Sequence, residues 1–246
     1  MNLHYSITGD GPLTVVLTHG LAASEATWAA QIPALAARHR VVGWDLRGHG
    51  RSDAAPHPCT IPELAGDLRG VLDRAGAERA VVLGHSAGGV VAMQFALDHP
   101  TRTAGLVLVG TASECNARAR QFYTDLAALA EERGMGPVRK RLGVSDVQAA
   151  QAPTDAATFA WVARAMASLH QAPLTPRLGE IRCPAQMIVG EKDFLGAGGS
   201  VLLHRAIAGS RLAIVPGRGH GIFLEDPGGF NAMVLEFLDS IDPRGR

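Results

Sequence analysis

Six short runs of mostly aliphatic and β-branched residues recur along the chain, and helix-like segments separate them. The runs lie at residues 14–18, 41–44, 80–83, 106–109, 186–189 and 212–215. Their hydrophobicity is nearly continuous, which is typical of strands buried on both faces of a mostly parallel sheet. Residues 3–8 alternate between polar and apolar and predict an antiparallel edge strand. The alternation of strands and helices along the chain predicts right-handed crossovers and an α/β fold. This fold is a three-layer sandwich with helices on both faces of the sheet.

The segments between the runs carry helix signals. Thr60 and Glu63 have the spacing of a capping box, which predicts a helix to about residue 75. Ser24 is a candidate N-cap for a helix to residue 37, which Pro33 must kink or shorten. Alanine-rich residues 87–97 directly follow one of the predicted strands and predict a further helix.

The alternation of strands and helices stops between residues 113 and 179. This stretch contains helical runs and several glycines and prolines, and no convincing strand. We interpret it as a helical insertion that forms a lid over the functional site. Residues 1–112 and 180–246 then form the core of the same domain, since 246 residues suit one α/β domain.

Composition and termini exclude several classes of function. Lys plus Arg (23) equal Asp plus Glu (23), so the zero net charge argues against a nucleic-acid partner. The start of the chain has no basic segment followed by an apolar run, and apolar runs are far shorter than the ~18 residues that a membrane span needs. We therefore expect a soluble, cytoplasmic protein. The three cysteines show no metal-binding spacing, and we expect neither a metal nor another cofactor.

Gly84-His85-Ser86-Ala87-Gly88 has the pattern G-x-S-x-G between a predicted strand and a predicted helix. The pattern alone is weak, but this context makes it specific. So sharp a turn requires a strained backbone with positive φ at Ser86 and small residues at 84 and 88, because these two crowd together. The turn lifts the hydroxyl to a helix N-terminus, which favours a developing anion. Ser86 is the predicted nucleophile.

Four blocks of the sequence resemble the α/β-hydrolase superfamily, and the resemblance covers nearly the whole chain. They are the Thr-His-Gly-Leu turn at 18–21, Asp-Leu-Arg-Gly-His-Gly-Arg-Ser at 45–52, the turn around Ser86, and the stretch 219–227 with His220. The resemblance implies a lid-bearing serine hydrolase of the esterase or enol-lactonase type. It also implies an oxyanion hole formed by the backbone N–H groups of Leu21 and Ala87.

A serine hydroxyl needs a neighbouring imidazole to take its proton. His220 is the predicted base because it follows the last strand in a glycine-rich loop. His85 is next to Ser86 but is expected to point away and pack, and His19 and His49 are expected to hold loops.

The superfamily's chain order of serine, acid and histidine points to Asp193 as the acid that orients the base. Asp193 leaves the end of the predicted strand 186–189 and resembles the family's G-x-x-D block. Glu114 is the rival, because some family members carry their acid after the strand that corresponds to 106–109.

The walls of the substrate pocket are the least determined feature. An apolar pocket with few polar groups suits a small acyl ester. The stretch from the lid to residue 190 also resembles 3-oxoadipate enol-lactonases, and Arg118, Arg120 or Arg164 are candidate partners of a substrate carboxylate, although solvent exposure is the expectation for them. The candidate wall residues are Phe122, Tyr123, Phe159, Trp161, Met166, Phe194 and Leu195.

These features predict a serine hydrolase that cleaves a small carboxylic ester through an acyl-enzyme intermediate. An enol-lactonase, a hydrolase of carbon–carbon bonds in ring-cleavage products, and a thioesterase or acyltransferase are alternatives. A non-catalytic protein that binds a ligand with the same fold is an alternative of another class. The expected partner is a small ester or lactone, and the sequence decides neither the oligomeric state nor the mobility of the lid.

Overall fold

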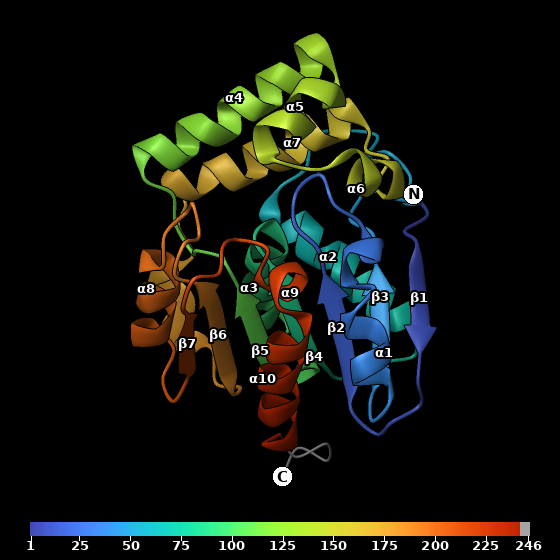
Figure 1. Cartoon of the computed structure of the whole chain (residues 1–246), viewed down its shortest axis with the longest axis vertical. Coiled ribbons are helices and arrows are strands. Elements are labelled where there is room, and N and C mark those ends of the chain that lie inside the picture. Colours follow the sequence, from blue (N-terminus) through green and yellow to red (C-terminus); the bar gives the residue numbers. More distant parts are fainter. Residues whose placement is uncertain (242–246) are drawn as a thin grey trace.

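The computed structural model describes residues 1–241, apart from the side chains of residues 146–148. Seven strands of this part form one sheet in the order β1-β3-β2-β4-β5-β6-β7 (Figure 1). Every neighbouring pair is parallel except β1 and β3, so the predicted antiparallel edge and mostly parallel sheet are confirmed. The strands are β1 (Tyr5–Thr8), β2 (Thr14–Thr18), β3 (Arg40–Trp44), β4 (Ala80–His85), β5 (Thr103–Val109), β6 (Ala185–Gly190) and β7 (Arg211–Val215).

Helices cover both faces of the sheet. On one face, α2 (Ile61–Arg74), α3 (Ala87–Asp98) and α8 (Gly198–Ala206) share an apolar cluster with the strands. On the other face, α1 (Gln31–Ala36), α9 (Ile222–Glu225) and α10 (Pro227–Asp239) form a second cluster, in front of the sheet in Figure 1. Val15 and Val16 of β2 belong to different clusters, which shows that the strand is buried on both faces.

The predicted helix ends are correct at one site and only partly so at another. The capping box at α2 is present, since Glu63 N–H donates to Thr60 Oγ1 (3.4 Å) and Thr60 N–H donates to Glu63 Oε2 (2.8 Å). Ser24 does cap a helix, but the short 3-10 helix η1 (Glu25–Trp28) is separate from α1. A continuous helix would need an N–H at residue 33, which proline lacks.

The stretch between β5 and β6 is helical at one end of the molecule, above the carboxyl ends of the strands (Figure 1). We call residues 110–184 the helical insertion. Outside the insertion, a short 3-10 helix, η2 (Pro100–Arg102), precedes β5. The insertion contains α4 (Ala117–Arg133), α5 (Met135–Leu142), α6 (Asp146–Gln151), α7 (Ala156–Ala167), η3 (Ser168–His170) and η4 (Thr175–Glu180).

Helix α7 joins this insertion to the core. One side of α7 packs on α4 in an apolar cluster that includes Phe159 and Leu126, and another side contributes Met166 to the large core cluster. Every helix in the described part of the chain is too short or too polar to cross a membrane.

The loop at residues 45–52 is bonded directly to the insertion. Gly50 N–H donates to Pro153 O (2.7 Å), and Asp155 N–H donates to Gly48 O (2.8 Å). Gly48 has φ of +67°, and a Cβ there would lie 2.4 Å from Thr158 Cβ. Only glycine fits this junction, because a side chain would be strained and would collide with α7.

Candidate active site

Ser86 lies on a strained turn between β4 and α3, with φ of 52° and ψ of −118°. Its backbone is held on both sides, since Ser86 N–H donates to Val109 O (2.9 Å) and Thr111 Oγ1 donates to Ser86 O (2.7 Å). Ala22 is the only other non-glycine residue with positive φ in the described part of the chain, and it borders the same cavity as Ser86. Such conformations cost about 1–3 kcal/mol each, so backbone strain is concentrated at this site.

The glycines on either side of Ser86 allow the close approach of backbone that the turn needs. A Cβ on Gly84 would lie 2.3 Å from Gly88 O, and a Cβ on Gly88 would lie 2.3 Å from Thr18 O. These contacts give the physical reason for the small residues in the sequence pattern.

The structure brings His220 and Asp193 together, although they follow different strands. His220 Nδ1 lies 2.8 Å from Asp193 Oδ2, and the side chains are 19% and 1% exposed, respectively. A carboxylate only accepts, so Nδ1 carries the proton and leaves Nε2 available as an acceptor. Leu195 N–H donates to the other oxygen of Asp193 (2.9 Å). A Cβ on Gly110 would lie 2.8 Å from Asp193 Oδ2, so glycine leaves the space that this pair occupies.

Glu114, the rival acid, lies elsewhere. Its side chain is exposed, and Glu114 Oε2 accepts a hydrogen bond from Thr175 Oγ1 (2.6 Å) at the other end of the insertion. It has no contact with His220 among the hydrogen bonds and ion pairs of residues 1–241.

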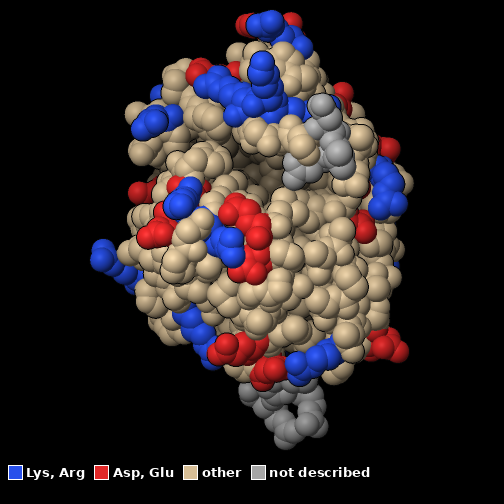
Figure 2. Space-filling view, in the orientation of Figure 1, with Lys and Arg blue, Asp and Glu red and all other residues tan. Residues whose placement is uncertain are grey.

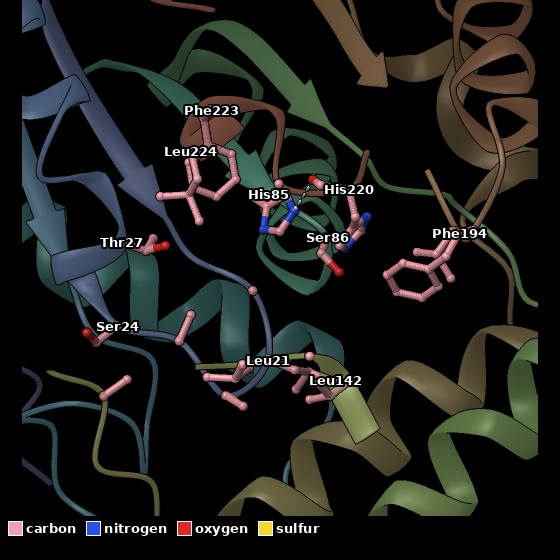
Figure 3. Close-up of a pocket in the computed structure, with 18 of the residues that line it drawn as sticks. Leu21, Ser24, Thr27, His85, Ser86, Leu142, Phe194, His220, Phe223 and Leu224 are labelled. Carbon is pink, nitrogen blue, oxygen red and sulfur yellow. Dashed lines mark hydrogen bonds between the residues drawn. The ribbon is translucent and has the colours of Figure 1, made fainter. Parts of the chain in front are cut away.

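Ser86 and His220 line the same cavity, and Figure 3 shows the Ser86 side chain beside the His220 ring. The hydrogen bond through which Ser86 Oγ would pass its proton to His220 Nε2 is not formed within the described residues. Such bonds are often long without a substrate and tighten when it binds.

The two predicted oxyanion donors flank Ser86. Ala87 is the first residue of α3, and Leu21 follows β2 in a turn where a Cβ on Gly20 would lie 3.2 Å from Ser86 Cβ. Within the described chain, neither the Leu21 N–H nor the Ala87 N–H donates to a protein group, so both are free for a substrate oxygen.

His19 holds that turn in position. Its Nδ1 donates to Gly20 O (2.7 Å), and its Nε2 accepts from Leu46 N–H (3.0 Å). These bonds require the neutral ring, and burial lowers the pKa of His19 accordingly. The expectation that His19 holds a loop agrees with these contacts.

His85 has a role that sequence reasoning missed. Its Nε2 donates to the backbone oxygen of His220 (3.1 Å), and the two ring centroids are 4.5 Å apart (Figure 3). Burial lowers the pKa of His85 well below its usual value, which keeps the ring neutral beside His220. No local signal could have predicted this contact, because the residues are far apart in sequence.

A cavity of about 370 Å³ opens between the insertion and the strand ends, and Figure 2 shows its mouth as a hollow. Part of its rim is apolar, because Phe194, Leu195 and Leu224 on its lining are 63%, 40% and 46% exposed, respectively. Predicted site residues on its lining are Leu21, Ser86, Phe122, Tyr123, Phe194, Leu195 and His220.

A second cavity, of about 310 Å³, also reaches Ser86. It extends between β5, the start of α4, and α8. Tyr123 and Leu195 line both cavities.

Three predicted wall residues are not in these linings. Trp161 packs against the large core cluster and lines neither cavity, and Phe159 and Met166 are fully buried. The prediction that Trp161 borders the pocket is therefore wrong for these two cavities. The reason is that α7 packs between α4 and the core, so its apolar side chains are used for packing.

The candidate arginines are also outside both linings. Arg164 forms an exposed ion pair with Glu131 (2.6 Å), and Arg118 and Arg120 are exposed on α4. No group of three or more His, Cys, Asp or Glu suited to a metal ion is present in the described residues.

Comparisons with known proteins agree with this architecture. Residues 14–132 match a family model described as the alpha/beta hydrolase fold. The chain is 33% identical to a protein named putative carbamate hydrolase RutD from Shigella flexneri, covering 94% of this chain and 93% of that protein.

Two solved structures share the fold over almost the whole chain. An enol-lactonase from Burkholderia xenovorans LB400 is 28% identical with a TM-score of 0.86, covering 97% of this chain and 96% of its own. A thermophilic esterase from Thermogutta terrifontis is 27% identical with a TM-score of 0.87, covering 96% of this chain and 93% of its own.

Proposed function

The chain belongs to the α/β-hydrolase superfamily, and from that premise we propose that it is a serine hydrolase of small carboxylic esters that works through an acyl-enzyme intermediate. The observation that carries the proposal is the 2.8 Å pair of Asp193 and His220 beside Ser86 at one cavity. Ser86 is the nucleophile, His220 the base, and Asp193 the acid that orients the base.

In the first half of the reaction, Ser86 Oγ forms a bond to the substrate carbonyl carbon and its proton passes to His220 Nε2. The carbonyl electrons move to oxygen, where the N–H groups of Leu21 and Ala87 stabilise the oxyanion. Collapse of this intermediate breaks the bond to the leaving oxygen, which takes the proton from His220. Water repeats the sequence on the acyl-enzyme and releases the acid.

Asp193 acts on His220 and not on the substrate. Its carboxylate accepts the Nδ1–H, which holds the ring in the tautomer with a free Nε2 and stabilises the imidazolium that forms. The carboxylate is almost completely buried, so this interaction is only weakly screened by solvent.

Hydrolysis of a carbamate is a second candidate, favoured by the relative that is named a putative carbamate hydrolase. A carbamate carbonyl has the same attacked carbon and the same developing oxyanion, so the same residues would serve. A lactone is the cyclic form of the ester proposal, and the similarity to an enol-lactonase supports including lactones among the substrates tested.

The test uses a fluorophosphonate probe and p-nitrophenyl butyrate. We expect the probe to label Ser86 covalently and the ester to turn over repeatedly. Ser86→Ala should abolish both while circular dichroism remains unchanged, and the exposed Ser240→Ala is the matched control that should retain both. Labelling without turnover of any ester, lactone or carbamate would show a ligand-binding protein instead of an enzyme.

The ester and the carbamate are separated by one comparison. We expect kcat/KM to be higher for phenyl acetate than for phenyl N-methylcarbamate, because the amide-like nitrogen of a carbamate makes its carbonyl less reactive. A higher value for the carbamate would replace the ester proposal with the second candidate.

A further inference from the structure

The two cavities meet at the candidate nucleophile and are divided there. Ser86, Tyr123 and Leu195 are the lining residues that they share. Tyr123 comes from α4 and Leu195 from the loop after β6, so the insertion and the core each contribute one side chain to the division.

The catalytic groups are distributed unequally between the two cavities. His220 and Leu21 line the cavity of about 370 Å³ and do not line that of about 310 Å³. We call these the His220 cavity and the Thr111 cavity, since Thr111 lines only the second.

This distribution limits how an ester can lie. The tetrahedral carbon carries Ser86 Oγ, the oxyanion, the leaving oxygen and the acyl carbon. The oxyanion must face the N–H groups at Leu21 and Ala87, and the leaving oxygen must face His220 Nε2, which returns the proton to it. Both requirements direct these groups toward the His220 cavity. The remaining substituent is the acyl chain, and the Thr111 cavity is the remaining opening at Ser86.

We propose that the Thr111 cavity is the acyl subsite and that the His220 cavity holds the leaving group. This inference rests on the proposed function, and it adds the orientation of the substrate and the class of acyl chain.

The walls of the Thr111 cavity define that class. Small residues line it on two sides, and a Cβ on Gly199 of α8 would lie only 2.8 Å from Ala112 Cβ. Thr111 already donates its hydroxyl proton to Ser86 O, so it has no second proton to donate to a ligand. Glu114 is the one charged side chain on the described lining, near the exposed end. A cavity lined largely by small residues, with one carboxylate and no described lysine or arginine, favours an unbranched, uncharged acyl chain.

The His220 cavity also lacks lysine and arginine on its described lining, and Glu225 is its only carboxylate. Among the described residues, neither cavity therefore offers a lysine or an arginine to a substrate carboxylate. The pairing of a carboxylate with Arg118, Arg120 or Arg164 has no support in these linings.

The experiment uses two series of esters. The acyl series consists of p-nitrophenyl acetate, butyrate, hexanoate and octanoate, and the alcohol series consists of ethyl, butyl and hexyl butyrate. Ala119→Leu narrows the Thr111 cavity, and Ala26→Leu is the matched change at the His220 cavity. Neither site is fully buried, so both variants should fold.

We expect Ala119→Leu to lower kcat/KM for octanoate relative to acetate by about 10- to 200-fold while the alcohol profile stays that of the wild type. Ala26→Leu should change the alcohol profile and not the acyl profile. The wild type should prefer p-nitrophenyl pentanoate to the mono-p-nitrophenyl ester of glutarate.

If Ala119→Leu changed the alcohol profile and Ala26→Leu changed the acyl profile, the proposed orientation of the ester would be overturned. An unchanged acyl profile in Ala119→Leu would show that the Thr111 cavity is not a subsite. Preference for the glutarate ester would overturn the inferred class of acyl chain. Turnover of none of these esters would overturn the proposed function itself, which the other outcomes leave intact.

Discussion

The loops at the carboxyl ends of the strands and the helical insertion border the same cavity, but they are held in different ways. In the loops, Ser86, His220 and Asp193 are each fixed by hydrogen bonds, and the backbone of Ser86 is strained. The insertion contributes side chains such as Phe122 from ordinary helices. Apart from Thr111, which donates to Ser86 O, it forms no hydrogen bond to these three residues within the described chain.

The loops and the insertion should tolerate substitutions to different degrees. Hydrogen-bonded geometry on a strained turn has few alternatives, whereas apolar packing between helices accepts many substitutions of similar volume. We therefore expect changes in the loops to remove activity, and changes in the insertion to alter which substrates are preferred.

The largest expected effect is that of Asp193→Asn. An amide at this position favours the wrong tautomer of His220, so kcat should fall by about 10⁴-fold with an unchanged KM. Glu114→Gln, at the edge of the insertion, should change kcat by less than about fivefold. Steady-state kinetics on p-nitrophenyl butyrate measures both, and the reverse ranking would identify Glu114 as the acid.

The substitution Gly84→Ala tests whether the turn at Ser86 tolerates a change, with the free energy of unfolding as the measured quantity. A methyl group 2.3 Å from Gly88 O has no space, so the free energy of unfolding should fall by about 3 kcal/mol or more. Gly179→Ala in the insertion is the matched control, because it has nothing within 4 Å and no positive φ. It should be neutral or stabilise the protein by up to about 1 kcal/mol. Equal losses in urea unfolding would contradict the comparison.

The pH dependence of stability tests the junction between the two regions, where His49 forms an isolated β-bridge with Thr154 of the insertion. Burial lowers the pKa of His49 from 6.5 to about 3. At pH values between about 3 and 6.5, His49 therefore binds a proton in the unfolded chain but not in the folded protein. The free energy of unfolding should therefore fall as pH decreases below 6.5, with a slope of up to about 1.4 kcal/mol per pH unit from this residue.

Urea unfolding at intervals from pH 4 to pH 7 measures this slope. His49→Asn should make it shallower, and the exposed His57→Asn should leave it as in the wild type. Parallel curves for the wild type and His49→Asn would show that His49 is protonated in the folded protein.

The smallest expected effects lie within the insertion. Phe122 lines the His220 cavity and Trp161 does not. Phe122→Ala should change the ratio of kcat/KM between ethyl and hexyl butyrate by about 10-fold or more, since apolar contacts in a pocket contribute ~1–3 kcal/mol to discrimination. Trp161→Ala should lower stability without changing that ratio. If Trp161→Ala changed this ratio and Phe122→Ala did not, Trp161 and not Phe122 would be the residue that contacts the substrate.

The strands, the capped α2 and the turn at Ser86 could be predicted because their signals lie within a few neighbouring residues. Hydrophobic continuity identifies buried strands, and the two glycines around Ser86 follow from crowding inside one turn. Trp161 was assigned wrongly because helical spacing shows that a residue is on an apolar face, but not which neighbour covers that face.

The class of fold, the order of its elements and the turn that carries Ser86 follow from the amino-acid sequence, since each depends on short-range periodicity and sterics. Three further features required the folded structure: Asp193 and not Glu114 meets His220, His85 donates to the His220 backbone, and Tyr123 and Leu195 line both cavities. These are contacts between residues far apart along the chain. They depend on how strands and helices pack, and packing is a property of the whole folded chain that no single segment encodes.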